Sequence, residues 1–362
     1  MTDDAGDASG AEKAASLFDD LLREIIDRLP AGTNADEMPA LIDLAADTAA
    51  SAIVRQLRRT RRGMLAEHRA IRRGFETRLR DPWGPAFDLL ETLYVIAMEG
   101  GENYVARVVD QANAEDDYVF TVLARLHARA CHVVSEIYAL LRTGHGAGAH
   151  ARWRTLHEIA VVASFVADRG QDVARRYLEH VGVTAWHDAQ DYQSFAPRLG
   201  LEPYSAEEMN ELDRVRAELI AKYGKDFDRE WGWAAAELAP LQPTLRSLES
   251  AVDLDYWRPN YRVASHGVHG GPRALLSRLG VPDALGTLIV GASNAGLSDA
   301  GQDAAITLRV ICIRLLAHRA DLEGSTTARI IGLFAQDTVD AFVRAEQEMD
   351  RRIAAEQAQA ND

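Results

Sequence analysis

Hydrophobic residues recur every three or four positions through most of the 362-residue chain, which is the pattern of helices with one buried face. Residues 116–142 show it clearly, because Leu123, Leu126, Val133, Ile137 and Leu140 would lie on one side of such a helix. Alternation with a period of two, the mark of a half-buried strand, is almost absent. The sequence therefore predicts an all-α protein, built as a multi-helix bundle.

Local signals set the expected helix ends. Ser205 is followed three residues later by Glu208, a capping-box pattern that predicts a helix start. The glycine-rich run from Thr143 to Ala149 is expected to be a loop. Besides 116–142 and the helix after Ser205, we expect helices over 11–29, after Asn34, and over 86–98, 103–113, 150–167, 171–196, 272–279, 302–322 and 326–355. Gly100 and Gly101 are expected to end the helix over 86–98.

The run Asp81-Pro82-Trp83-Gly84-Pro85 predicts a break, since it places two prolines and a glycine within five residues. We expect an N-terminal helical appendage over 1–80 and a main helical domain over 81–362. No run approaches the roughly 20 apolar residues of a membrane helix, and Met1 to Gly10 lacks a signal-peptide pattern, which indicates a cytoplasmic protein. Cys131 and Cys312 sit in apolar runs and are expected to be buried thiols.

The charge is unevenly distributed. The whole chain carries a formal charge of −15, whereas residues 51–80 hold ten arginines against Glu67 and Glu76, a local net charge of +8. Within this segment the three- and four-residue spacing places several arginines on one helix face. They are candidates for contact with nucleic acid, and a solvated face paired with acidic neighbours is the alternative. The residues concerned are Arg55, Arg58, Arg59 and Arg62.

Candidate chemistry concentrates between Tyr256 and Pro272, where two histidines, two arginines, a serine, two tyrosines and a tryptophan occur together. Histidine is suited to act as a general base near neutral pH, and a guanidinium stabilises developing phosphorane charge. We predict His269 as the base and Arg262 as the phosphate clamp. The alternative is a structural hydrogen-bond cluster at helix ends. The candidate catalytic residues are Tyr261, Arg262, Ser265 and His269, with His266 in support.

Two further groups carry possible chemistry. Arg154 and Glu158 lie one helical turn apart and could pair, and Glu158 could also orient His269. His187 and Asp191 have the i, i+4 spacing of metal ligands, with His180 two turns before, so a metal-dependent hydrolase is an alternative. Compact zinc motifs and phosphate-binding glycine motifs are missing from the sequence, so the favoured interpretation includes neither a metal nor a cofactor.

Two motifs carry a resemblance to a known family. Arg154-Thr155-Leu156-x-Glu158 is followed later by Tyr261-x-x-x-Ser265-x-x-x-His269-Gly270. Together they resemble a widespread bacterial all-helical family of unknown function, over about residues 86–325. The resemblance names no substrate. It directs attention to five residues of the two motifs: Arg154, Glu158, Tyr261, Ser265 and His269.

The spacing of Arg262 and His269 is also similar to the motif of HEPN-type ribonucleases, which are helical and usually dimerise. Val263 departs from that motif, which commonly has a polar residue after the arginine. The likeness implies a metal-independent endoribonuclease or toxin effector in stress or phage defence, acting on RNA as a homodimer. The alternative is a non-enzymatic helical module that binds a ligand or senses a signal.

Overall fold

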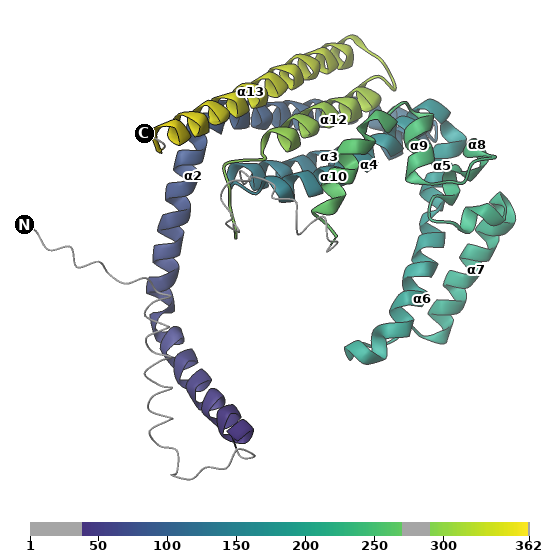
Figure 1. Ribbon diagram of the computed structural model, residues 1–362. Helices are drawn as coiled ribbons and strands as arrows, with labels where there is room; N and C mark the ends of the chain where they lie inside the picture. Colours follow the sequence, from purple (N-terminus) through teal and green to yellow (C-terminus); the bar gives the residue numbers. More distant parts are fainter. Residues whose placement is uncertain (1–37, 270–289, 361–362) are drawn as a thin grey trace, which may run out of the picture. The chain divides into compact units, whose positions relative to one another are not determined.

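The computed structural model describes residues 38–269 and 290–360, and every regular element in these ranges is a helix (Figure 1). The protein is therefore all-α, as predicted. The helices expected over 11–29 and 272–279 lie outside the described residues. The longer helices are α2 (Met38–Ala114), α3 (Tyr118–Arg142), α4 (Gly146–Arg169), α5 (Gln171–Glu179), α6 (Val181–Leu199), α7 (Ala206–Tyr223), α9 (Leu245–Ala251), α10 (Arg258–His266), α12 (Ser298–Leu316) and α13 (Leu322–Ala360).

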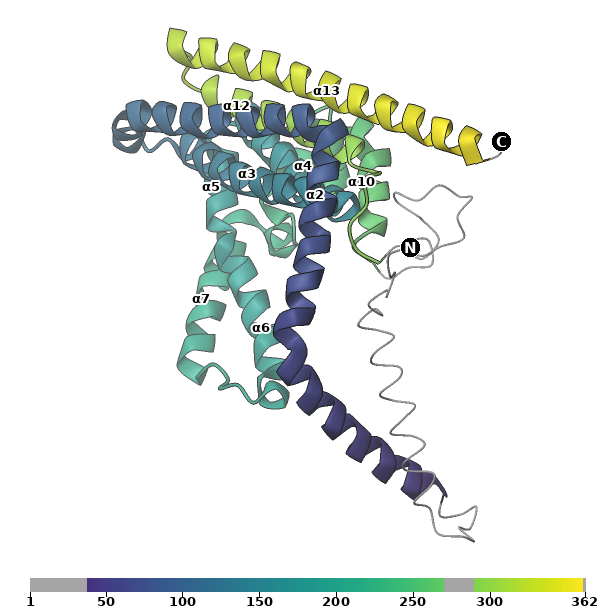
Figure 2. The ribbon, with the colours of Figure 1, turned by 90° about the vertical axis from the view of Figure 1, so that its left-hand side faces the viewer.

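The chain divides into two units, residues 1–77 and 78–362. The core of the second unit forms where α12 packs against α3, α4 and α13, as Figures 1 and 2 show. Its largest fully buried side chains include Trp83, Trp153, Tyr104, Phe165 and Phe342. The α6 and α7 helices form a pair that joins the rest through α5 and the 3-10 turn Lys225–Asp228.

The predicted break at residues 81–85 is wrong, because α2 continues through Pro82 and Pro85. A proline inside a helix costs about 3 kcal/mol. Burial of the neighbouring rings offsets that cost: Trp83 and Phe87 are 1% and 0% exposed, and their centroids lie 6.1 and 6.2 Å from that of Phe342. The Trp83 indole also donates to the carbonyl of Asn294 at 3.0 Å.

The glycine pair at 100–101, expected to end a helix, also lies inside α2. A Cβ atom at Gly101 would come within 2.1 Å of the buried His127 ring. The absence of a side chain therefore lets α3 approach α2 closely. Burial lowers the pKa of His127 to about 4, so the ring between these helices is neutral at pH 7.

Two other helix predictions have different outcomes. The capping box is confirmed, since Ser205 Oγ accepts from the backbone N–H of Glu208 at 3.2 Å and the Glu208 carboxylate accepts from the N–H of Ser205 at 2.8 Å. The helix expected over 171–196 is instead split at His180 into α5 and α6. The imidazole Nε2 of His180 lies 3.1 and 2.9 Å from the carbonyl oxygens of Phe227 and Arg229, and these contacts fix the junction between α5 and α6.

A glycine in α12 generates a stability prediction. At Gly301 a Cβ would lie 2.3 Å from the Phe342 ring, whereas at Gly332 in α13 nothing lies within 4 Å. We expect Gly301→Ala to destabilise the protein by about 1–3 kcal/mol through overpacking. Gly332→Ala should stabilise it by up to about 1 kcal/mol through helix propensity. Urea unfolding of the two variants measures both effects, and equal midpoints would contradict the packing.

Candidate functional site

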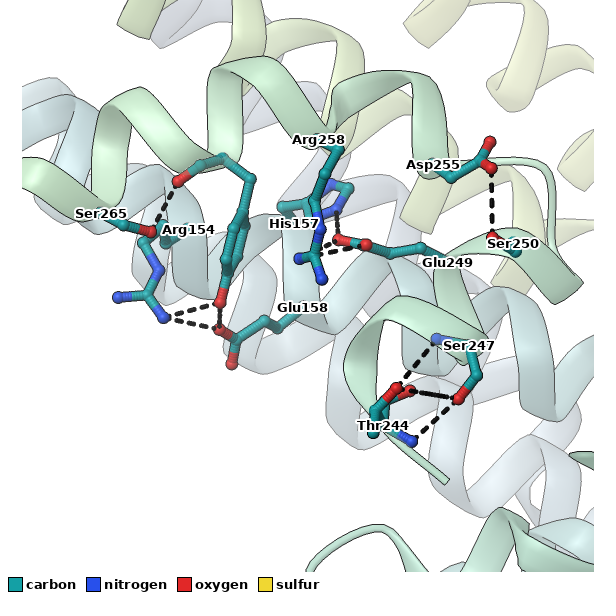
Figure 3. A network of polar contacts seen from close by, with 11 residues as sticks. Arg154, His157, Glu158, Thr244, Ser247, Glu249, Ser250, Asp255, Arg258 and Ser265 are labelled. Atoms are coloured by element: carbon teal, nitrogen blue, oxygen red, sulfur yellow. Dashed lines mark hydrogen bonds and ion pairs between the residues drawn. The ribbon is translucent and has the colours of Figure 1, made fainter. Parts of the chain in front are cut away.

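The candidate site lies where α10 packs against α4, with α9 beside them (Figure 3). Each helix turns a short set of polar side chains toward the others. Because the α4 residues lie 91 to 111 positions before those of α9 and α10, only folding brings them together. The α4 helix supplies Arg154, His157 and Glu158, the α9 helix supplies Glu249, and the α10 helix supplies Arg258, Tyr261 and Ser265.

Tyr261 is the centre of one polar group. Its hydroxyl donates to Glu158 Oε1 at 2.6 Å and accepts from Arg154 Nη2, also at 2.6 Å. Arg154 in turn lies 3.4 Å from Glu158, and its guanidinium carbon is 4.6 Å from the centroid of the Tyr261 ring. Burial and then the Glu158 hydrogen bond raise the pKa of Tyr261, so the phenol remains a proton donor at neutral pH.

Glu249 is the centre of a second, more deeply buried group. Its side chain is 0% exposed, and its Oε1 accepts from His157 Nε2 at 2.9 Å. Arg258 Nη1 lies 3.2 Å from the other carboxylate oxygen. A buried carboxylate is tolerated only where cations and donors compensate for the lost water. Glu249 therefore ties α9 to both α4 and α10.

Aromatic rings fill the space between these polar groups. The Trp153 centroid lies 5.4 Å from His157 and 5.7 Å from Trp257, and His157 lies 5.6 Å from Tyr261. The Trp153 indole donates to Thr307 Oγ1 of α12 at 2.9 Å. These contacts connect the site to the hydrophobic core, which restrains the side chains of α10.

An open pocket of about 780 Å³ is formed by side chains of α9 and α10. Its cationic and imidazole groups come from both helices and from the turn after α10. We call it the cationic pocket. It is lined by Arg246, Arg258, Pro259, Arg262, Val263, Ser265, His266 and His269.

The cations of this pocket differ in their partners. Arg258 is held by Glu249. In contrast, the side chains of Arg246, Arg262, His266 and His269 form no ion pair or side-chain hydrogen bond with the described part of the chain. Ser265 Oγ donates to the carbonyl of Tyr261 at 2.7 Å, which leaves its oxygen lone pairs open. The pocket can therefore offer positive charge to an anionic ligand.

The sequence candidates thus fall into two sets. Arg262, Ser265, His266 and His269 line the cationic pocket, whereas Tyr261, Arg154 and Glu158 form the neighbouring hydrogen-bonded group. The sequence suggested that Glu158 could orient His269, but the Glu158 carboxylate has other partners. Its Oε1 already serves Tyr261 and Arg154, and no hydrogen bond joins Glu158 to His269.

Residues 120–285 match the sequence profile of a family of unknown function (DUF5677). The matched range includes α4, α9 and α10, and hence the candidate site. The expected resemblance to an uncharacterised family is confirmed in this form, over a shorter range than the motifs suggested. Neither a curated protein nor a solved structure matches the chain.

Three site residues were missed by the sequence reasoning. Glu249 and Arg246 belong to a short helix of unremarkable composition, and nothing in the sequence indicates that one is fully buried and the other lines a pocket. Arg258 lay within the histidine-rich stretch but received no role. Its position at the start of α10, facing the buried Glu249 of α9, is known only from the structure.

The proposed metal ligands are engaged elsewhere. His180 faces the carbonyls of Phe227 and Arg229, and His187 Nε2 lies 3.3 Å from Asp228 Oδ1. Across residues 38–269 and 290–360, no three His, Cys, Asp or Glu side chains gather in a metal-binding arrangement. Likewise, none of the described helices has the length and apolarity needed to cross a bilayer.

We expect Tyr261→Phe to destabilise the protein by about 1–3 kcal/mol, because the lost hydroxyl leaves Arg154 and Glu158 without their shared partner. The matched control is Tyr256→Phe, whose ring is 63% exposed, and its effect should stay within about 0.5 kcal/mol. Urea denaturation followed by circular dichroism gives both values. Indistinguishable midpoints for the two variants would show that the Tyr261 group contributes nothing.

Proposed function

We propose that this protein is a metal-independent, HEPN-like endoribonuclease that binds the RNA phosphodiester in the cationic pocket. The observation that carries the proposal is one open pocket lined by two histidines and by two arginines that have no ion-pair partner within the described residues. Guanidinium groups without protein partners attract a phosphate, and imidazoles transfer protons near neutral pH.

Local charge makes this proposal compatible with an acidic chain. The net charge of −15 is repulsive to nucleic acid at long range, but a phosphate in the pocket meets Arg246, Arg258 and Arg262 directly. Within the described residues, only Arg258 among these has its charge balanced, by Glu249. The net local charge offered to the ligand is therefore positive.

The proposed reaction is a transesterification. His269 removes the proton from the ribose 2′-hydroxyl, the 2′-oxygen attacks phosphorus, and the bond from phosphorus to the 5′-oxygen breaks. His266 supplies the proton that the leaving 5′-oxygen requires, and the product ends in a 2′,3′-cyclic phosphate. Arg262 stabilises the additional charge on the phosphorane oxygens.

Arg258 acts as a positioning residue in this scheme. Its guanidinium is fixed by the buried Glu249 and lies 5.3 Å from the Tyr261 ring centroid. A rigid cation at the wall of the pocket loses little freedom when a phosphate binds, which favours affinity. The polar groups behind the pocket thus contribute by holding α10 in place.

The arginine-rich part of α2 extends the proposal. Arg55, Arg58, Arg59 and Arg62 are exposed and form no ion pair within the described residues. We propose that they bind RNA phosphates outside the reaction centre. A homodimeric toxin effector in stress or phage defence is the biological role that the HEPN likeness implies for such an enzyme.

The test of the reaction is cleavage of a labelled single-stranded RNA by the purified chain in EDTA. We expect His269→Ala to lower the cleavage rate by about 10² to 10⁴-fold. His132→Ala, which removes an exposed α3 histidine outside the pocket, should cleave like the wild type. An RNA with a 2′-deoxyribose at the cleaved position should bind and remain intact.

Two results would overturn the assignment. Identical cleavage patterns for the wild type and His269→Ala would place the chemistry elsewhere or in a contaminant. Pocket-dependent RNA binding without any cleavage would replace the enzyme with the second candidate, a non-enzymatic ligand-binding or sensor module. If the single substitution Arg262→Ala abolishes RNA binding, the binding occurs in the cationic pocket and is not a non-specific electrostatic attraction.

The role of the α2 arginines is tested by salt dependence. Replacing Arg55, Arg58, Arg59 and Arg62 with glutamine should reduce the slope of log affinity against log salt by about 3, since each phosphate contact with a single strand contributes about 0.7. The matched control replaces four α13 arginines, Arg329, Arg344, Arg351 and Arg352. Equal slopes for both variants would remove α2 from the RNA-binding surface.

A further inference from the structure

The N-terminal part of α2, purple in Figure 1, has an apolar stripe that is accessible to a partner. Leu57, Met64 and Ile71 are 43%, 41% and 61% exposed, and Ile53 and Phe75 are half-buried. At 100° per residue these five side chains fall within about 40° of arc. We call this set the α2 seam.

The opposite side of the same helix is cationic. Arg55, Arg62, Arg69 and Arg73 also fall within about 40° of arc, centred roughly 160° from the middle of the α2 seam. A helix that lies on an anionic bilayer keeps its cations beside the apolar face, near the lipid phosphates. Here Arg55, Arg62, Arg69 and Arg73 point away from the seam, as do three more of the ten arginines, whereas Arg61, Arg72 and Arg78 lie within about 80° of its middle. The majority on the far side favours a protein partner that covers the seam and leaves most of the arginines in solvent.

The spacing of the α2 seam is symmetric about Met64. Leu57 and Ile71 lie seven residues to either side of it, and Ile53 and Phe75 lie eleven residues to either side. Reversing the direction of the helix therefore superimposes the apolar positions on themselves. This is the property that an isologous contact between two antiparallel copies requires.

We propose that the α2 seam binds the α2 seam of a second copy of this chain in an antiparallel, two-fold symmetric pair. Met64 meets its counterpart at the centre, Leu57 lies level with the partner's Ile71, and Ile53 lies level with the partner's Phe75. Burial of these side chains removes exposed apolar surface, and seven of the ten arginines of residues 51–80 point outward, away from the contact.

The first experiment measures molar mass by light scattering over a range of concentrations. The full chain should have twice its monomer mass of 39.8 kDa. Met64→Glu should raise the dimer dissociation constant by about tenfold or more, because each copy would bury an unpaired carboxylate. Leu65→Glu is the matched control: Leu65 is equally exposed, at 41%, but lies about 100° off the seam, so this variant should remain dimeric.

The second experiment tests the direction of the pair by disulfide formation. Met64→Cys should cross-link with itself, and Leu57→Cys should cross-link with coexpressed Ile71→Cys. Neither Leu57→Cys nor Ile71→Cys should cross-link alone, since identical positions would be about 21 Å apart along the axis, far beyond disulfide range. Cys131 and Cys312 are buried and stay in every variant.

Three results would overturn the proposal. A wild type that is monomeric at every concentration excludes the pair. Dimerisation that appears only after deletion of residues 1–36 would assign the seam to the chain's own N-terminal segment. Self-cross-linking of Leu57→Cys would show a parallel pair. None of these measurements needs RNA, so their outcome is independent of the proposed ribonuclease activity.

Discussion

The arrangement of the candidate site depends on the buried charge of Glu249. A carboxylate with 0% exposure has lost its hydration, and among the described residues His157 from α4 and Arg258 from α10 replace it. Removing one partner of such a group typically costs about 3–5 kcal/mol, because the remaining charge stays buried. The three helices are therefore coupled: α10 cannot move away from α4 and α9 without exposing or orphaning this carboxylate.

This coupling also explains why the cationic pocket keeps its charge. Two acidic groups that contact α10 are already engaged, Glu249 with Arg258 and His157, and Glu158 with Tyr261 and Arg154. No carboxylate from residues 38–269 or 290–360 lines the pocket to neutralise Arg246 or Arg262. The same packing of α10 thus pairs the charges of Glu249 and Glu158 with protein groups and leaves Arg246 and Arg262 in the pocket.

The sequence predicted what depends on local pattern. The all-α class followed from apolar periodicity, and the start of α7 followed from Ser205 and Glu208. The tendency of Arg154 and Glu158 to pair was also visible, because i, i+4 neighbours on a helix must lie close together.

The remaining features depend on contacts between distant segments. Local rules predicted a break at Pro82 and Pro85, but the burial of Trp83 and Phe87 against Phe342 outweighs the proline cost. Glu249 has no distinctive sequence context, since its burial is decided by residues 92 positions before it and 9 after it. A charge buried by tertiary packing leaves no periodic signal in one sequence.

The two parts of α2 show how one helix can meet different constraints. At Trp83, the burial of aromatic rings keeps the chain helical although Pro82 and Pro85 disfavour a helix there. Between Ile53 and Phe75, apolar side chains remain accessible and are spaced symmetrically, while most of the arginines lie on the opposite face. An exposed apolar stripe on a helix loses free energy to water until something covers it. In the pair that we propose, a second copy would cover this stripe and leave most of the arginines facing solvent, where the proposed RNA ligand would reach them.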